Sequence, residues 1–390
     1  MTKITFTKDQ FKALQANEAL CADFVKNESI STYFVTSGTK ISVYHYGQGV
    51  ILNSEVDVKE ITEDNFFVVP MERFLTNLSK VFESADEASV EYSKDDNLFT
   101  FKGKKSTFTL KGFKTVDATE MEEIKQAYDT KVKSIVDPIE IKVTPELLKF
   151  NGLISKYMAL TTDCNAVTIN KTSLKYLDRM IIANKTASGI SDSDKDIYLV
   201  KTMFNIVDKI HKTTGDFNLK FASDSSTVSF DIGVIKGIFQ QSNISVVMPS
   251  EDEIAEALPD ESNITKLTVN RADLIDTFKS FEGIFDASRK MSKTYVKANQ
   301  DMLNKGELLF TFADAFTKAE SKLPVTLVST NAPDADFIIS LSSLVDAADI
   351  IGDADTLDIE YSSIAIGEPH GSGIKVADAN STVYIMKFFE

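Results

Sequence analysis

One short pattern of apolar residues occurs six times along the chain, and it limits the fold more than any other feature of the sequence. In each copy two apolar residues stand two positions apart, and a third follows five positions after the second. Residues two apart lie on one face of a strand, and the third, in a following helix, folds back onto the same core. The six copies, at intervals of 56 to 74 residues, are Ile4, Phe6, Phe11; Phe67, Val69, Phe74; Ile141, Val143, Leu148; Ile197, Leu199, Phe204; Leu267, Val269, Leu274; and Phe337, Ile339, Leu344.

Residues that favour helix starts stand at the junctions between the expected strands and helices. Thr7, Thr144, Asn270 and Ser340 are suitable N-caps, while Pro70 and Pro145 suit a first helical turn. Two or three strand-like runs follow each junction, such as ASVEYS, NLFTFKG and STFTLKGF after the second helix. The sequence therefore predicts one module, a strand, a helix and then three strands, present in six copies.

Pairs of modules predict three similar domains in an α+β chain. A length of 390 residues exceeds one ordinary core and fits three domains. The joins are expected in two acidic stretches, residues 117–138 and 249–263, whose charge and prolines favour exposed crossings rather than core. The expected domains are residues 1–136, 137–262 and 263–390, each with two βαβββ halves.

Basic residues recur on the expected helices although the whole chain is acidic. With 58 acidic and 42 basic residues the net charge is -16, so any contact with nucleic acid must be local. Most of the basic side chains share one helical face away from the core, and we expect the first five helices to be neutral or basic. The candidate DNA-facing residues are Lys8, Lys12, Arg73, Lys80, Lys149, Lys156, Lys201, Lys209, Lys212, Arg271 and Lys279.

Two helices depart from this pattern. Arg73 and Lys80 of the second helix lie at a different angle, and the sixth helix carries Asp346 and Asp349 without any lysine. A wet helix face often carries lysine for solubility alone, which is the plainer explanation of the stripe. If the face binds DNA, lysine side chains would meet phosphates rather than read bases, so binding would be independent of sequence.

The sequence offers no recognisable catalytic or cofactor motif. Cys21 and Cys164 are far apart, so neither a disulfide framework nor a cysteine metal site is expected. Asp192, Asp194 and Asp196 begin like a calcium loop, but Ile197 stands where glycine is needed. Phosphate-binding glycine loops are absent, and the three histidines lack partners at ligand spacing. We expect a soluble, cytoplasmic protein without enzymatic activity, cofactor or metal, because no signal peptide or membrane span is evident.

With these observations, the whole chain resembles a DNA polymerase sliding clamp of the bacterial beta-clamp type. The most specific matches are QSNISVVMPSEDE at 241–253, SSLVDAADII at 342–351 and GSGIKVADANSTVYIMKFFE at 371–390. The low overall identity suits a divergent or phage-encoded member. The resemblance implies the DNA clamp fold, with helices lining a central hole and sheets outside, in a head-to-tail homodimeric ring around double-stranded DNA. It also implies a processivity factor for DNA replication that tethers the polymerase.

The resemblance further implies an apolar cleft where short linear motifs of the polymerase and the clamp loader dock. Carried over to this chain, the cleft residues are Leu174, Val246, Val247, Met248, Pro249, Tyr384, Ile385 and Met386. The chain departs from the family at 170–180, where NKTSLKYLDRM replaces a turn of the Asp-Gly-His-Arg type. The wall that the second domain would contribute therefore differs from the family pattern.

Three other interpretations remain open at this point. A β-rich structural protein, such as a virion or surface-layer component, would share the acidity and the Thr- and Ser-rich strands. An enzyme would have to hide its acid, base or nucleophile in loops. Within the clamp interpretation, the assembly could be a trimer or a lone subunit instead of a dimer.

Overall fold

The computed structural model describes most of the 390 residues. The description leaves out residues 26–29, 48, 113–114, 151–165, 178–180, 242–243, 245–262, 283–292, 314–316, 332–335, 353, 363–372 and 387–390. None of the helices in the described part is both long and apolar enough to span a membrane.

Six modules follow one another along the chain, each a strand and a helix and then three strands. The first is β1 (Thr2–Thr7), α1 (Lys8–Val25), β2 (Ser31–Ser37), β3 (Lys40–Gly47) and β4 (Val50–Asp57), and the second is β6 (Asn65–Val68), α2 (Met71–Phe82), β7 (Glu87–Ser93), β8 (Leu98–Lys102) and β9 (Thr107–Lys111). The third is β10 (Ile139–Val143), helical residues 145–150, β11 (Ala166–Ile169), β12 (Ser173–Leu177) and β13 (Ile181–Thr186).

The last three modules repeat this order. The fourth is β14 (Ile197–Val200), α5 (Lys201–Thr214), β15 (Phe217–Phe221), β16 (Thr227–Asp231) and β17 (Ile235–Gln240). The fifth is β18 (Ile264–Asn270), α7 (Arg271–Glu282), β19 (Lys293–Lys297), β20 (Glu307–Ala313) and β21 (Lys318–Thr330), with the short α8 (Gln300–Asn304) after β19. The sixth is β22 (Phe337–Ser340), α9 (Leu341–Ile351), β23 (Thr356–Ser362), β24 (Gly373–Ala377) and β25 (Ser381–Met386). The predicted α+β fold of six βαβββ modules is confirmed.

The apolar pattern that predicts the modules also marks the core. All but two of its residues are buried. The exceptions are Leu148, which is half-buried beside the fully buried Leu147, and Phe337, which is half-buried with its ring 4.9 Å from that of Tyr361. At the third helix, the core-facing residue is therefore one position earlier than predicted.

Only some of the predicted caps bind the helix ends. Thr7 and Gln10 form a reciprocal capping box, with Thr7 N–H donating to Gln10 Oε1 at 2.9 Å and Gln10 N–H to Thr7 Oγ1 at 3.3 Å. Asn270 Oδ1 accepts from the N–H of Ala272 at 2.8 Å. Ser340 stands at the cap position of α9 without a capping hydrogen bond, and Pro70 precedes the first turn of α2 instead of lying in it.

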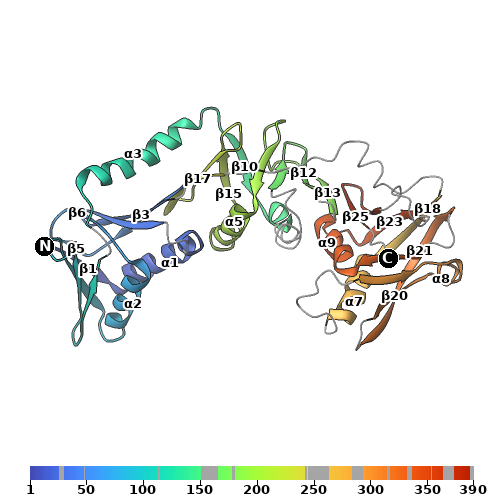
Figure 1. Ribbon diagram of the computed structural model, residues 1–390, viewed down its shortest axis with the longest axis horizontal. Helices are drawn as coiled ribbons and strands as arrows, with labels where there is room; N and C mark the ends of the chain where they lie inside the picture. The colour runs from blue at the N-terminus through green and yellow to red at the C-terminus, as the bar shows by residue number, and fades with distance from the viewer. Residues whose placement is uncertain are drawn as a thin grey trace. The chain divides into compact units, whose positions relative to one another are not determined.

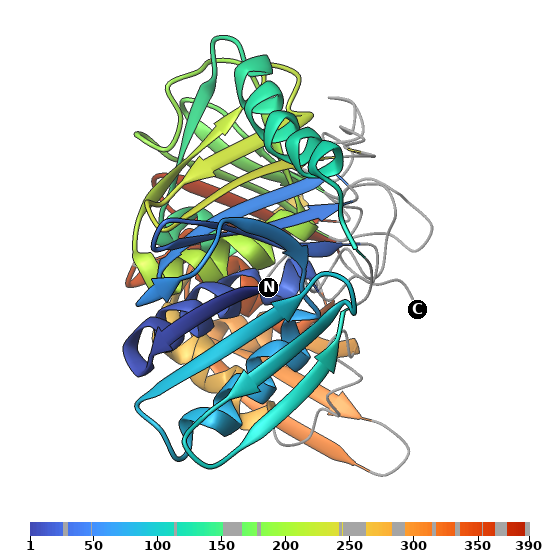
Figure 2. The same ribbon diagram turned by 90° about the vertical axis from the view of Figure 1, so that its left-hand side faces the viewer.

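The modules assemble into two compact units, residues 1–144 with 205–243 and residues 145–204 with 244–390. Their boundary falls inside the expected second domain, so the division at 136 and 262 stays a prediction. The first unit contains a five-stranded sheet in the order β5-β1-β7-β8-β9, where β5 is Glu60–Ile61, and an eight-stranded sheet in the order β10-β15-β16-β17-β4-β3-β2-β6. Figure 2 shows β7 to β9 of the first sheet lying across α2.

The core of the first unit lies where α1 and α2 pack against both of its sheets. Phe74 of α2 meets Phe34 of β2 and Phe101 of β8, each with ring centroids 5.2 Å apart and edge to face. Phe11 of α1 stacks on Phe82 at 4.9 Å. Removing one such buried ring usually costs about 3–5 kcal/mol, so these contacts fix where the helices lie.

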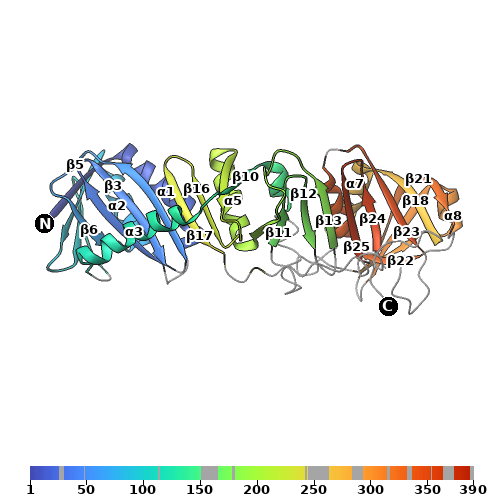
Figure 3. The same ribbon diagram turned by 90° about the horizontal axis from the view of Figure 1, so that it is seen from above.

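The second unit contains one twelve-stranded sheet, in the order β14-β11-β12-β13-β25-β24-β23-β18-β21-β20-β19-β22. Figure 3 shows β11 to β13 and β25 to β23 side by side in it. Helix α9 packs on β25, β13 and β24, and α7 packs on β18, β21 and α9. The strands of the twelve-stranded sheet therefore position both α7 and α9.

The acidic stretch after β9 forms a helix that belongs to none of the modules. This helix, α3 (Ala118–Ser134), starts at Asp117, whose side chain accepts a hydrogen bond from the N–H of Glu120. Met121 and Ile124 are buried with Tyr33 and Val68 of the eight-stranded sheet. Figure 1 shows α3 on the face of this sheet opposite to α1 and α2.

Modules that are not neighbours in the sequence join by edge-to-edge pairing of their last strands. The last strand of the first module, β4, pairs with β17, the last strand of the fourth. In the same way β13 of the third module pairs with β25 of the sixth. In both joins an odd module, the first or the third, pairs with the even module three places later through antiparallel strands.

Candidate functional site: basic side chains on the repeated helices

Six of the predicted basic side chains lie on the protein surface. They are Lys8 and Lys12 of α1, Arg73 and Lys80 of α2, Lys212 of α5 and Lys279 of α7. Lys80 Nζ also lies 6.0 Å from the centre of the Phe108 ring, within the range of a weak cation–π contact. These side chains can reach a ligand without rearrangement of the fold.

Four of the predicted lysines have a carboxylate one helical turn earlier in the same helix. The Nζ–O distances are 3.7 Å for Lys12 and Asp9, 3.0 Å for Lys149 and Glu146, 2.6 Å for Lys212 and Asp208, and 3.5 Å for Lys279 and Asp276. Solvent-exposed pairs of this kind contribute only about 0.3–0.5 kcal/mol. A phosphate oxygen can therefore replace the carboxylate at the exposed lysines at little cost.

The helices are less basic than their lysines alone indicate. Within its bounds α1 carries Lys8 and Lys12 against Asp9, Glu18 and Asp23, and α7 likewise carries two basic against three acidic residues. The expectation that each of the first five helices is neutral or basic is therefore wrong for α1 and α7. Basic residues are in excess in α2 and in α5.

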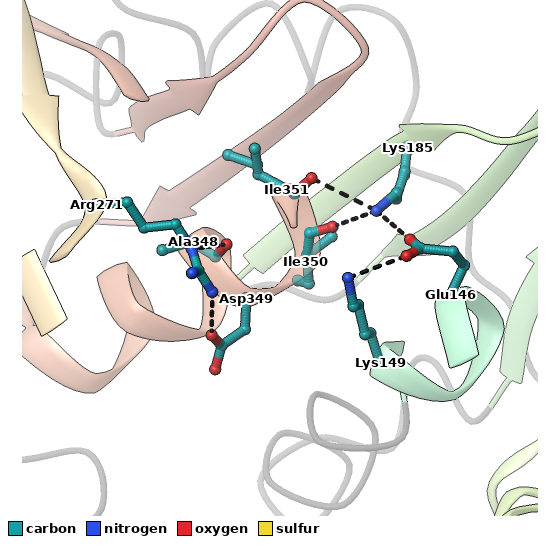
Figure 4. A network of polar contacts seen from close by, with 8 residues as sticks. All are labelled: Glu146, Lys149, Lys185, Arg271, Ala348, Asp349, Ile350 and Ile351. Atoms are coloured by element: carbon teal, nitrogen blue, oxygen red, sulfur yellow. Dashed lines mark hydrogen bonds and ion pairs between the residues drawn. The ribbon is translucent and has the colours of Figure 1, made fainter. Parts of the chain in front are cut away.

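The sixth helix, α9, obtains basic side chains from other elements. Lys185 of β13 donates from Nζ to the carbonyl oxygen of Ile350 at 2.8 Å, and Arg271 of α7 donates from Nε to that of Ala348 at 3.2 Å (Figure 4). Both carbonyls belong to the last turn of α9, where the helix has unpaired acceptors and the negative end of its dipole. Arg271 also pairs with Asp349 at 3.1 Å.

A single carboxylate links two lysines to this helix end. Glu146 lies 2.5 Å from Lys185 Nζ through one oxygen and 3.0 Å from Lys149 Nζ through the other (Figure 4). Burial opposes the charge on Glu146, but the two ammonium groups hold the pKa of its carboxyl below the ordinary value. At Asp349 burial outweighs the nearby Arg271, so the pKa of its carboxyl is raised above the ordinary value.

This network engages two of the predicted DNA-facing residues. The side chains of Lys149 and Arg271 are 29% and 28% exposed, compared with 65% for Lys12. Both are already bound at the end of α9 or beside it. The absence of lysine from α9 is thus balanced by cations that come from three other elements.

The remaining predicted basic residues are less well defined. Lys156 lies outside the described residues, and Lys201 is the first residue of α5 but its side chain is not described. Lys209 is half-buried in α5.

The predicted partner-cleft residues fall into different environments. Val246, Val247, Met248 and Pro249 lie outside the described residues, as does the side chain of Met386. Leu174 and Ile385 are fully buried in β12 and β25. Tyr384 is half-buried, on the opposite face of β25 from the buried residues on either side of it. Burial, followed by the charge of Glu360, raises the pKa of the Tyr384 hydroxyl, which therefore stays protonated.

Lys185 and Glu146 are the site residues that the sequence pattern left unnoticed. In β13 the alternate residues Ile181, Ala183 and Lys185 are all buried, so Lys185 occupies an inward position of the strand. A lysine in phase with apolar strand residues is the signal that could have identified it, because buried lysine is rare without a partner.

A second buried polar group holds α1 to its sheet. His45 of β3 is fully buried, with Nε2 3.1 Å from Glu18 Oε1 and Nδ1 2.9 Å from Thr32 Oγ1.

Burial and the nearby Glu18 raise the pKa of the Cys21 thiol far above its usual range, so this cysteine is an unreactive core residue. Among the residues that the structure describes, no three His, Cys, Asp or Glu side chains are grouped to hold a metal ion.

Comparison with solved structures identifies the fold. The beta subunit of DNA polymerase III from Borrelia burgdorferi matches with a TM-score of 0.70 and 15% identity, over 100% of both chains. The beta clamp of Helicobacter pylori, solved with a DNA ligase peptide, matches at 0.69 and 15% over 100% of both chains. The beta subunit of DNA polymerase III from Pseudomonas aeruginosa matches at 0.70 and 15%, over 99% of this chain and 100% of that one.

Comparison of the sequence itself with protein-family models and with curated proteins gives no match. The chain therefore shares the three-domain clamp fold over its whole length, with a sequence that has diverged strongly from these proteins. The resemblance seen in the sequence is confirmed at the level of the fold.

Proposed function

We propose that this chain is a sliding clamp, a subunit of a ring that encircles duplex DNA and tethers the replicative DNA polymerase for processive synthesis. The observation that carries the proposal is that six βαβββ modules span the chain and form the fold of bacterial clamps over its full length. In this role the protein retains partners on DNA in the cytoplasm of a bacterial or phage-infected cell. It catalyses no reaction and uses no cofactor.

The rule that joins the modules supports a head-to-tail ring. Applied to the fifth module, it requires β21 to pair with the last strand of the second module, which is β9. Among the strands that the structure describes, β9 pairs with β8 alone, and residues 318–324 of β21 pair with β20 alone. Each copy thus offers one free β9 and one free β21, and a second copy can satisfy both.

Two copies suffice for closure by this contact. A homodimer contains twelve modules and therefore twelve of the repeated helices, and its two interfaces would repeat the strand pairing seen at the two internal joins. Because the contact joins different surfaces of each copy, it makes a closed ring only if the rotation per copy returns to the start. A ring of this kind is retained on DNA by topology, which suits a chain with a net charge of -16.

Contact with DNA would use the exposed lysines and arginine of α1, α2, α5 and α7. Lys8, Lys12, Arg73, Lys80, Lys212 and Lys279 are the side chains that phosphates can reach directly. Lys149 and Arg271 first stabilise the end of α9 and would contribute less. Lysine offers a point charge rather than a planar fork, so the contact would be independent of base sequence and sensitive to salt.

The partner site is proposed at β25 and at the segment before β18. The Helicobacter pylori clamp was solved with a DNA ligase peptide, and a short linear motif of the polymerase or of a clamp loader would dock similarly here. Tyr384 is the most accessible described member of the predicted set. The buried Leu174 and Ile385 would support the site from the core side.

Retention on circular DNA is the decisive test. Protein diluted to separate its subunits is concentrated again with a nicked circular plasmid, so that rings can close around the duplex, and the mixture is passed over a gel-filtration column in high salt. We expect protein to co-elute with the circle, and to be released when a restriction enzyme linearises the plasmid. Equal retention on circles and on linear DNA, or none on circles, would contradict the proposal.

A further inference from the structure

The first strand of the third module, β10, has a free edge. The equivalent strands of the first and fifth modules are flanked on both sides, β1 by β5 and β7, and β18 by β21 and β23. In contrast, β10 pairs with β15 alone and is the outermost strand of its sheet. Among the first strands of the odd modules, β10 thus differs by having one neighbour, whereas β6, β14 and β22 of the even modules also end their sheets.

The outer backbone edge of β10 has no strand partner within the part of the chain that the structure describes. The inward N–H and C=O groups of β10 pair with β15. No described backbone group hydrogen-bonds to its outward N–H and C=O groups. Such an edge is a template for a further strand. Pro138 directly precedes β10 and Lys142 is exposed on it, two features that discourage indiscriminate pairing of edges.

A pocket of about 700 Å³ adjoins the same strand, beneath the end of α3. It lies among α3, β10, β15 and β16, and its charged lining consists of three carboxylates and one ammonium group, those of Glu140, Asp216, Asp231 and Lys220. Tyr128 and Val132 of α3 form the wall above. Pockets of this size accept a large side chain or a small ligand.

Three exposed valines lie on the pocket or close in the sequence to residues that line it. Val132, which lines it, is 37% exposed, and Val136, between α3 and β10, is 70% exposed. Val234, two residues after the lining residue Ile232, is 54% exposed. Apolar side chains gathered on a surface beside polar ones are typical of places where another protein binds.

The carboxylates of the pocket are available to an incoming cation. Each has an exposed lysine as a partner, with Lys220 3.4 Å from Glu140, Lys142 3.1 Å from Asp216 and Lys236 3.5 Å from Asp231. Asp216 is also held by His211 Nε2 at 3.0 Å, which leaves Glu140 and Asp231 as the more accessible carboxylates. Exposed pairs are weak and exchange easily. Burial, followed by the charges of Asp231 and Asp129, raises the pKa of Tyr128 to about 12, so its hydroxyl stays protonated.

We propose that β10 and the pocket beneath α3 together bind an extended segment of a partner protein. The segment adds a strand to the free edge and places an arginine or lysine opposite Glu140, from where its side chain enters the pocket beside Tyr128. Backbone hydrogen bonds supply affinity, and the cation supplies selectivity. Only Thr214, at the end of α5, belongs to a basic helix, and the remaining lining residues come from other elements. Binding at this site does not depend on the chain encircling DNA.

A designed peptide tests this site directly. The probe is a short, blocked, fluorescein-labelled peptide of alternating threonine and valine with one central arginine, and binding is followed by fluorescence anisotropy. Glutamate in place of arginine gives one control peptide, and N-methylation of the amides along one edge gives another. Hydrogen exchange at residues 139–143, with and without the peptide, locates the binding.

We expect saturable binding of the arginine peptide and slower exchange at residues 139–143. Glu140→Lys should weaken binding at least about fivefold, because it replaces an attractive cross-strand pair with a repulsive one. Glu87→Lys is the matched control, because Glu87 is also an exposed glutamate of a strand with a lysine partner. This variant should bind the arginine peptide as the unaltered protein does. Tyr128→Ala provides a second variant, on a different element, that should also lose affinity.

Three results would overturn the proposal. They are no binding of the arginine peptide at millimolar concentration, equal binding by Glu140→Lys, and equal binding of the N-methylated peptide. Melting curves of each variant confirm that an altered affinity does not come from an unfolded protein.

Discussion

A lysine that points into a protein normally needs partners, and Lys185 has them on two sides. Its side chain is 11% exposed, and its ammonium group joins Glu146 to the last carbonyls of α9. Gly352, the residue after α9, has a φ of 98°, and a Cβ there would lie 3.3 Å from both Lys149 Nζ and Lys185 Nζ. The backbone at this helix end therefore requires glycine, and any side chain there would also crowd the two ammonium groups.

Removal of the Lys185 ammonium group should destabilise the second unit. Lys185→Met keeps most of the side chain volume but leaves the Ile350 carbonyl and Glu146 without this donor. We expect the free energy of unfolding to fall by about 1–3 kcal/mol, the usual cost of an unsatisfied buried group. Chemical denaturation measures it, with Lys175→Met on the adjacent strand β12 as the control that should change little.

Glu146 should make the stability of the protein depend on pH. Its pKa in the folded chain is lower than the ordinary value of 4.5, so the folded state binds this proton less tightly than the unfolded state. The resulting stabilisation is complete above the ordinary pKa and is lost as the pH falls through the lower, folded value. Between about pH 6 and about pH 3, unaltered protein should lose more unfolding free energy than Glu146→Gln. Parallel curves for the two proteins would exclude this role.

At the scale of elements, the strand–helix junctions are the predictable part of the fold. A buried residue two positions before another, with a third in the following helix, reflects local geometry that a single module already determines. Leu147 and Leu148 show the limit, because both are apolar and adjacent, and only packing against the sheet selects Leu147. Helix α3 was expected only as a charged crossing, since its two buried residues, Met121 and Ile124, are too few for a clear periodic signal.

The site was less predictable than the fold for a related reason. The residues that engage Arg271 at the end of α9 are 77 and 78 positions away, and those that engage Lys185 are 165 and 166 away. A helical wheel shows which lysines face away from the core, but it cannot show which of them a distant helix end will capture. The distinction between Lys12, which is exposed, and Lys149, which is bound, exists only in the folded chain.

Retention on DNA should depend on the lysines of the repeated helices and not on the total surface charge. We expect Lys12→Glu, Lys212→Glu and Lys279→Glu combined to reduce retention on circular plasmid and processive synthesis at least about tenfold, because each removed phosphate contact also removes a released counterion. The fold should persist, since these exposed lysines contribute little stability.

A matched variant separates position from net charge. Lys40→Glu, Lys59→Glu and Lys102→Glu alter three exposed lysines outside the helices, each with its own carboxylate partner, and change the total charge by the same amount. Equal losses in the two triple variants would mean that the helices have no special role. Retention should be measured across a range of salt concentrations, where only the helix variant should flatten the slope.

At the scale of the whole molecule, assembly should depend on the free edge of β9. Phe108 and Thr109 are neighbours in this strand, so their N–H groups point to opposite sides, one toward β8 and one outward. Of Phe108→Pro and Thr109→Pro, one should melt like the unaltered protein and sediment as a monomer, because it loses only an outward donor. Dimers in both variants at low concentration would count against strand pairing at this interface.

The length of β21 has a mechanical consequence for such an assembly. Its first part, residues 318–324, lies along β20 and carries the free edge, while residues 325–330 lie along β18, the strand that leads directly into α7. No loop separates the two parts to absorb strain. If two copies join at this strand, a force that separates them would pass along β21 and through its pairing with β18 to α7 and Lys279. Opening such an interface would therefore also displace basic side chains of this helix.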